Sequence, residues 1–250
     1  HDRPYHGDKN DEGIVGSKKE PHWAYRFATL DIIERGNAIT LFMVPYKEFD
    51  TDEKIVRKLL EETKKRIRIK CLYGDQEFSS ACLIDIYNEL GIDYIVRAKG
   101  DYIYKKEKAT TKPIWFEYTR KRYENKNPIY TTTTWVICVF EKEDGKLKKE
   151  SYFTNRVVTH SNKNKFYKWY DARWNIEIDY RSSNIFIPKT SAKSYVVRFF
   201  YFVLCLILRN IWVFVNLKIK QKFGVKIRCK PLLTADDFIF LIFKRHNLSV

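Results

Sequence analysis

The sequence predicts an α/β fold in which a mixed β-sheet is flanked by helices. A hairpin is expected from residues 23–34 and 38–45, two aromatic and β-branched segments separated by a turn containing Gly36 and Asn37. A strand, a helix and a second strand follow, at residues 67–73, 79–90 and 93–97. This order is typical of a crossover between parallel strands.

The remaining elements follow from capping and turn signals. Asp50 and Glu53 resemble a capping box before a helix whose apolar face carries Ile55, Leu59 and Leu60. A second hairpin is expected from residues 130–140 and 147–153 around an Asp-Gly turn, and residues 234–237 are expected to cap a last short helix. Residues 1–20 are polar and glycine-containing, which predicts a loop.

These patterns predict three parts along the chain. Residues 1–99 and 161–250 form the helix-flanked core, and residues 100–160 form a β-rich insertion within it.

The chain of 250 residues is strongly basic. Lys and Arg total 47 against 31 Asp and Glu, a formal net charge of +16. Such a charge on a folded chain indicates an anionic partner, first of all nucleic acid, although a lysine-rich genome would give the same balance. Basic clusters could line a DNA path or could be solvated faces; they lie at 64–68, 105–106, 120–122 and 218–230.

The five cysteines are spread along the chain without a CxxC pair. This pattern argues against a disulfide framework and a zinc ribbon, and it favours a reducing, cytoplasmic compartment. The sequence opens at His1 without a signal segment, and its single methionine is Met43, so we expect a fragment of a longer polypeptide.

Residues 195–215 are apolar enough to raise the question of a membrane helix. Arg198, Arg209 and Asn210 interrupt the segment, and such side chains are costly in lipid. The pattern therefore favours a buried core helix and no membrane contact, with a peripheral membrane protein as the alternative.

Asp75 follows the strand expected at residues 67–73, in the sequence Leu-Tyr-Gly-Asp-Gln-Glu. Active-site crevices open at the carboxyl ends of parallel strands, so a carboxylate there is a candidate catalytic group. The alternative is that Asp75 is only a turn residue after Gly74.

The segment 168–181 has helical propensity and an unusual face. Residues three and four apart share it, namely Tyr170, Arg173, Trp174, Glu177 and Arg181. The face combines two aromatic rings, two cations and one carboxylate, where a buried face would be aliphatic. It is either a functional surface or an exposed face on which Glu177 pairs with Arg173 and Arg181.

These residues resemble the Tyr-x2-Arg-x3-Glu-x6-Lys signature of one branch of the DDE transposases of prokaryotic insertion sequences. Tyr170, Arg173 and Glu177 match in type and spacing, while Asn184 stands at the Lys position. Asp75 lies where the second aspartate of that family lies, and residues 100–160 correspond to its β-rich insertion. The resemblance covers about residues 1–215 and implies a ribonuclease H-like fold whose opening strand is missing.

The resemblance also implies metal-dependent DNA cleavage and strand transfer. Asp75 and Glu177 would be catalytic ligands of two Mg²⁺ or Mn²⁺ ions, which prefer carboxylate oxygens. The implied DNA-contacting residues are Tyr170, Arg173, Arg181 and Asn184. The implied partner is DNA, both element ends and target, bound by a homodimer in the nucleoid of a prokaryotic cytoplasm.

The first aspartate of the family precedes a Pro-Tyr-x-Gly stretch that residues 4–7 resemble. We therefore expect this metal ligand upstream of His1, with Asp2 as the alternative. If the natural polypeptide lacks it, the chain is an inactive DNA-binding remnant.

Overall fold

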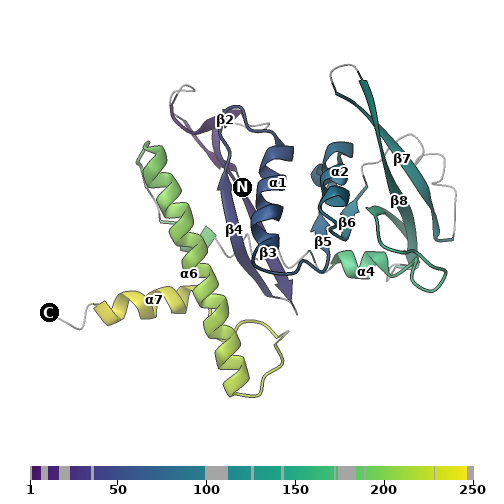
Figure 1. The fold of residues 1–250 in the computed structure, drawn as a ribbon. Helices are drawn as coiled ribbons and strands as arrows, with labels where there is room; N and C mark the ends of the chain where they lie inside the picture. The colour runs from purple at the N-terminus through teal and green to yellow at the C-terminus, as the bar shows by residue number, and fades with distance from the viewer. Residues whose placement is uncertain are drawn as a thin grey trace. The chain divides into compact units, whose positions relative to one another are not determined.

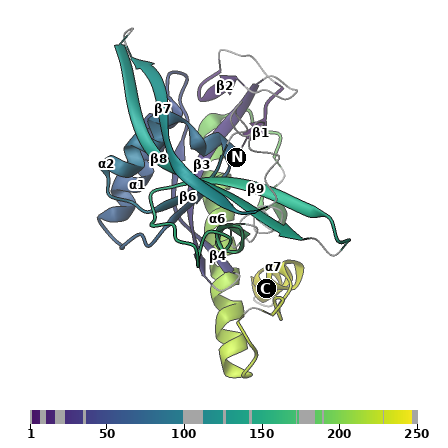
Figure 2. The same ribbon diagram turned by 90° about the vertical axis from the view of Figure 1, so that its right-hand side faces the viewer.

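The computed structural model describes residues 2–6, 11–16, 23–34, 37–98, 112–124, 127–141, 144–171, 173, 184–188, 190–227 and 229–246. They belong to two compact units. The first unit comprises His1–Thr51 and Trp174–Val250, and the second comprises Asp52–Arg173. Each unit has its own sheet, and the ribbon views in Figures 1 and 2 show the elements of both.

The first unit is built on a four-stranded antiparallel sheet around β3. Its strands are β1 (Asp2–Pro4), β2 (Ile14–Gly16), β3 (Trp23–Glu34) and β4 (Asn37–Pro45). Strands β3 and β4 form the predicted hairpin, paired from Phe27 opposite Pro45 to Glu34 opposite Asn37. The prediction of this hairpin is confirmed.

The expectation of a loop over residues 1–20 is wrong for β1 and β2. Both strands pair with the start of β3, which gives its backbone N–H and C=O groups hydrogen-bonding partners. The same segments bring Tyr5 and Ile14 into a buried cluster with Tyr25, Phe27 and Phe202. Each strand has only three residues, too few for an alternating pattern to be visible in the sequence.

Helix α6 (Tyr195–Lys222) packs on β4 through polar as well as apolar contacts. The side chain of Asn210 accepts from Thr40 N at 3.0 Å and donates to Thr40 O at 2.8 Å, as a neighbouring strand would. Arg209 is 1% exposed and donates to Ala38 O at 2.8 Å. Figure 1 shows α6 lying beside the hairpin. The residues that interrupt the apolar segment therefore attach it to the sheet.

By length and composition alone, α6 could cross a membrane, and core helices of soluble proteins meet the same criterion. Its hydrogen bonds to β4 favour the core-helix interpretation. One face remains exposed and apolar, with side chains at helical spacing: Val196, Phe200, Ile207, Ile211 and Phe214.

Helix α7 (Ala235–His246) begins where the sequence predicts. Thr234 Oγ1 accepts a hydrogen bond from Asp237 N at 3.1 Å and donates to the Asp237 carboxylate at 2.6 Å. The helix packs against α6 and the 3₁₀ turn η2 (Asn184–Phe186) through Phe186, Trp212 and Phe238. The predicted cap is confirmed.

The second unit contains a five-stranded mixed sheet in the order β5-β6-β9-β8-β7. Its strands are β5 (Leu72–Gly74), β6 (Tyr94–Arg97), β7 (Ile114–Glu124), β8 (Asn127–Glu141) and β9 (Leu147–Thr154). Strands β5 and β6 are parallel, as the sequence predicts, and the other pairs are antiparallel. Because β9 pairs with β6, the β-rich segment extends the sheet that β5 and β6 begin. The division at residues 99 and 160 stays a prediction.

Four short helical elements accompany this sheet. They are α1 (Asp52–Lys64), η1 (Gln76–Ser79), α2 (Ala81–Glu89) and α4 (Phe166–Asp171). Helix α2 packs on α1 and on the β7–β8 ribbon, which Figure 2 shows in full length. It begins with a Ser80 cap and ends before Gly91, whose φ of 61° is a left-handed conformation that suits glycine.

Two local predictions need correction. The strand expected at 67–73 is limited to β5, because β6 offers partners only to Leu72, Tyr73 and Gly74. Helix α1 begins at Asp52, so Asp50 lies before it, and its carboxylate instead accepts from Lys47 N at 2.9 Å in the preceding turn.

Candidate active site at the end of strand β5

Asp75 lies at the carboxyl end of β5, beside the parallel neighbour β6. The register pairs Gly74 with Val96, so the next residues, Asp75 and Arg97, emerge at the same edge of the sheet. A side chain at Gly74 would place its Cβ 2.9 Å from Phe78 Cβ and 3.1 Å from Val96 Cγ1. Glycine is therefore needed for the close approach that turns the chain at Asp75.

The half-buried Asp75 side chain also shapes the turn that follows. Its Oδ1 accepts from Glu77 N at 2.9 Å and caps the 3₁₀ turn η1. Tyr87 of α2 fixes the same turn by donating its hydroxyl to Phe78 O at 3.2 Å. No hydrogen bond to the second oxygen, Oδ2, occurs in the described part of the chain. The turn thus holds the carboxylate by one oxygen and leaves the other for a ligand.

Tyr170 and Arg173 come from the end of α4 and the turn after it. Tyr170 is 5% exposed, and its ring lies 5.0 Å from that of Tyr152 between centroids. The Arg173 guanidinium carbon lies 5.2 Å from the centroid of the Tyr170 ring, and Arg173 N donates to Tyr170 O at 2.9 Å. The ring is a buried platform on which the guanidinium stacks.

The sheet edge and the α4 segment meet in one electrostatic site. Burial raises the pKa of the Tyr170 hydroxyl, and the charge of Asp75 raises it further, while Arg173 and Arg97 act in the opposite direction. These effects require Asp75, Arg173 and Arg97 each to lie near the Tyr170 hydroxyl. The structure therefore brings Asp75, Tyr170 and Arg173, predicted from distant parts of the sequence, into one site.

Glu150 of β9 holds the neighbouring cation Arg97. Its carboxylate lies 3.9 Å from Arg97 Nη2 and 2.6 Å from Lys148 Nζ, and it accepts the Tyr152 hydroxyl. Burial alone would raise the pKa of Glu150, but its hydrogen bonds to Lys148 and Tyr152 and the nearby positive charges lower it below the ordinary value.

The first unit contains two other predicted residues. Both carboxylate oxygens of Asp2 are bound by Arg26, at 2.7 and 3.0 Å. Asn184 Oδ1 accepts from Arg3 Nη1 at 3.1 Å, which brings the predicted DNA-contacting residue next to β1.

Glu177 and Arg181 lie outside the described residues, as does most of the predicted helix 168–181. Helix α4 ends at Asp171, and Arg173 lies in a turn. Within the described ranges no three His, Cys, Asp or Glu side chains form a group that could hold a metal ion.

Sequence reasoning missed Arg97 and Arg3. Arg97 ends the strand next to β5, so the strand-end argument that selected Asp75 would have found it as well. Arg3 has no such signal, because its link to Asn184 joins residues 181 positions apart.

The comparisons with known proteins identify the family. The family described as Transposase DDE domain matches residues 40–211, more than half of the chain. The chain therefore belongs to the transposase DDE domain family. None of the curated proteins matches its sequence.

A solved structure gives the fold. The chain is similar to a piggyBac transposase in the cryo-EM structure of its synaptic complex with hairpin DNA, with a TM-score of 0.57 and 10% sequence identity. The similarity covers 96% of this chain and 51% of the other, so this chain spans about half of its neighbour's length. At this identity the likeness concerns the fold, and the predicted α/β, ribonuclease H-like class is confirmed.

Proposed function

We propose that the chain is the catalytic domain of a DDE transposase that cleaves and joins DNA with divalent metal ions. The observation that carries the proposal is the convergence of Asp75 with Tyr170 and Arg173 at the carboxyl edge of two parallel strands. Family membership, the net charge of +16 and the neighbour's complex with hairpin DNA support it. An insertion-sequence element and a homodimeric active complex in the nucleoid are the context we propose for it.

The donor chemistry of Asp75 fits a hard divalent cation. Its Oδ2 carries no hydrogen bond in the described chain, and Oδ1 is held by a backbone N–H, which keeps the carboxylate oriented. Asp75 and Glu177 would hold Mg²⁺ or Mn²⁺, and a two-ion centre would activate the attacking oxygen and stabilise the leaving one.

The cations around Asp75 would bind the DNA strand. The guanidinium groups of Arg173 and Arg97 suit the oxygens of a phosphodiester, because the planar fork can donate two hydrogen bonds. The burial of Tyr170 favours a positioning role, in which its ring fixes Arg173. Arg181 and Asn184 are further DNA contacts in this proposal.

One observation favours a second function, that of an inactive DNA-binding remnant. Asp2 is the alternative third ligand, but its carboxylate is bound by Arg26. If no aspartate precedes His1 in the natural polypeptide, the chain would bind DNA without cleaving it.

The test is a cleavage assay with the full natural polypeptide, labelled element-end DNA and Mg²⁺ or Mn²⁺. Glu177→Ala should abolish nicking and strand joining and leave DNA binding nearly intact. Glu77→Gln is the matched control, since it removes an exposed carboxylate two residues from Asp75 and should cleave like the wild type. Unchanged cleavage by Glu177→Ala would refute the assignment, and binding without cleavage by the wild type would establish the remnant.

A further inference from the structure

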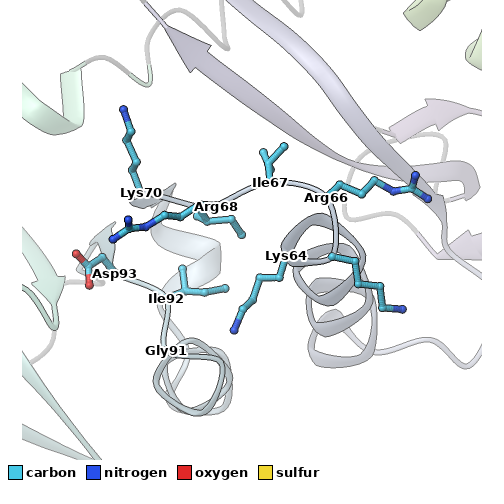
Figure 3. A pocket seen from close by; sticks show the side chains of 10 residues that line it. Lys64, Arg66, Ile67, Arg68, Lys70, Gly91, Ile92 and Asp93 are labelled. Carbon is cyan, nitrogen blue, oxygen red and sulfur yellow. The ribbon is translucent and has the colours of Figure 1, made fainter.

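A cation-rich cavity lies at the other end of β5. It has a volume of about 810 Å³ and is lined by residues 64–70, which join α1 to β5, and by residues 91–93, which follow α2. Figure 3 shows this α1–β5 pocket and its side chains. Five of its lining side chains are cationic and one, Asp93, is anionic. The cavity therefore carries a large excess of positive charge.

Some of this charge is already matched within the protein. Lys64 Nζ donates to Leu90 O at the carboxyl end of α2, where a cation offsets the negative end of the helix dipole. Lys65 Nζ lies 2.6 Å from Glu62 Oε1. The one acidic residue of the pocket, Asp93, lies 3.7 Å from the guanidinium of Arg156, which further reduces its effect on the pocket cations.

Arg68 and Lys70 differ from Lys64 and Lys65 in that their charges are not matched in this way among the described residues. Both are exposed, and no hydrogen bond or ion pair to either side chain occurs in the described part of the chain. In Figure 3 the side chain of Arg68 extends toward the side of Asp93, while Lys70 points away from residues 91–93. Two long cations that point in different directions suit several phosphates along a strand better than one small anion in a closed cage.

We infer that the α1–β5 pocket binds backbone phosphates of DNA, through Arg68 and Lys70, at a place separate from the Asp75 edge. This inference rests on the proposed function, because it assumes that the partner is DNA. Lys70 precedes β5 and Asp75 follows it. Five residues of extended chain span at most about 18 Å. At 3.4 Å per base pair, the pocket would contact DNA at most about five base pairs from the phosphate at Asp75.

The test is the salt dependence of DNA binding by the full chain, measured without divalent metal so that no cleavage occurs. Fluorescence anisotropy with a labelled duplex between 50 and 200 mM NaCl gives the slope of log affinity against log salt. Each phosphate contact contributes about 0.9 to that slope, so each contact accounts for about a 3.5-fold loss of affinity over this range. Arg68→Gln/Lys70→Gln should therefore lower the slope by about 2. Between 50 and 200 mM NaCl, the fold-loss of affinity of this variant should be about 12 times smaller than that of the wild type.

The matched control is Lys47→Gln/Lys146→Gln, which removes two exposed cations that lie outside the basic clusters of the sequence. It should keep the wild-type slope to within about 0.5, because cations that contact no phosphate release no counterions from DNA. Circular dichroism and the melting temperature should be unchanged in both double variants, since all four side chains are exposed. A slope for Arg68→Gln/Lys70→Gln equal to that of the control would overturn the inference.

Three further outcomes separate the possible failures. If inorganic phosphate displaces the duplex more strongly than chloride at equal ionic strength, and only when Arg68 and Lys70 are present, the pocket holds a small phosphate ligand and the inference fails. If the chain cleaves DNA but both double variants bind alike, the inference fails and the proposed function stands. If the pocket variant loses slope although the natural polypeptide never cleaves, the inference stands and the catalytic proposal fails.

Discussion

Replacing Asp75 by asparagine and by alanine separates its structural contribution from its proposed catalytic one. Asparagine keeps an oxygen that can accept from Glu77 N, so the cap of η1 survives and only the charge is lost. Alanine removes both the charge and the cap. Both variants should be inactive, but only alanine should be measurably less stable.

The expected sizes follow from the contact that each variant loses. Loss of a cap costs about 1 kcal/mol, which lowers the melting temperature of a chain of this length by about 2–4 °C. Asparagine should stay within about 0.5 kcal/mol of the wild type. Loss of a metal ligand removes several kcal/mol of transition-state stabilisation, and about 4 kcal/mol corresponds to roughly 10³-fold slower cleavage.

Thermal unfolding and single-turnover nicking of labelled DNA by the natural polypeptide measure the two effects separately. For Asp75→Asn we predict the melting temperature of the wild type together with lost cleavage. If this variant cleaves within tenfold of the wild type while Asp75→Ala melts lower, Asp75 is only a turn residue and the proposed site is wrong.

Three other changes test the surroundings of the site and the attachment of α6. Tyr170→Phe should cleave within about threefold of the wild type, because the ring rather than the hydroxyl supports Arg173; a loss above 100-fold would show a direct hydroxyl contact. Glu150→Gln should lower the free energy of unfolding by about 2 kcal/mol at pH 7. Because the folded-state pKa of Glu150 is lowered, its stabilising contribution is present above the unfolded-state pKa of about 4.3 and is lost as the pH falls through the folded value. In urea titrations the difference between wild type and variant should therefore be smaller at pH 3 than at pH 7, and an equal difference at both would contradict this. Asn210→Leu should cost about 2–3 kcal/mol, since both hydrogen bonds to the Thr40 backbone are lost; a denaturation midpoint equal to that of the wild type would mean that α6 does not depend on β4.

The sequence predicts the elements whose signals are local. The hairpin β3–β4 follows from two long β-rich segments and a turn between them, and the start of α7 follows from Thr234 and Asp237. Asp75 could be placed at a sheet edge because the carboxyl ends of two parallel neighbouring strands lie at the same edge of the sheet.

The elements that the sequence does not predict depend on partners far along the chain. Strands β1 and β2 exist because β3 offers unpaired backbone groups, and β5 begins where β6 begins. The stacking of Arg173 on Tyr170 depends on the turn after Asp171, which helical periodicity does not indicate. Because the helix ends at Asp171, three- and four-residue spacing alone does not place Glu177 on the same face as Tyr170.

The sharing of a metal ion by Asp75 and Glu177 can be measured directly. When Fe²⁺ replaces Mg²⁺ in the full chain, ascorbate and peroxide generate hydroxyl radicals at the bound ion that cut the backbone nearby. We predict two sets of cuts, one around Asp75 and one around residues 170–177, both competed by Mg²⁺ and both lost in Asp75→Asn. Cuts near only one of the two carboxylates, or cuts that persist in Asp75→Asn, would contradict a shared ion site.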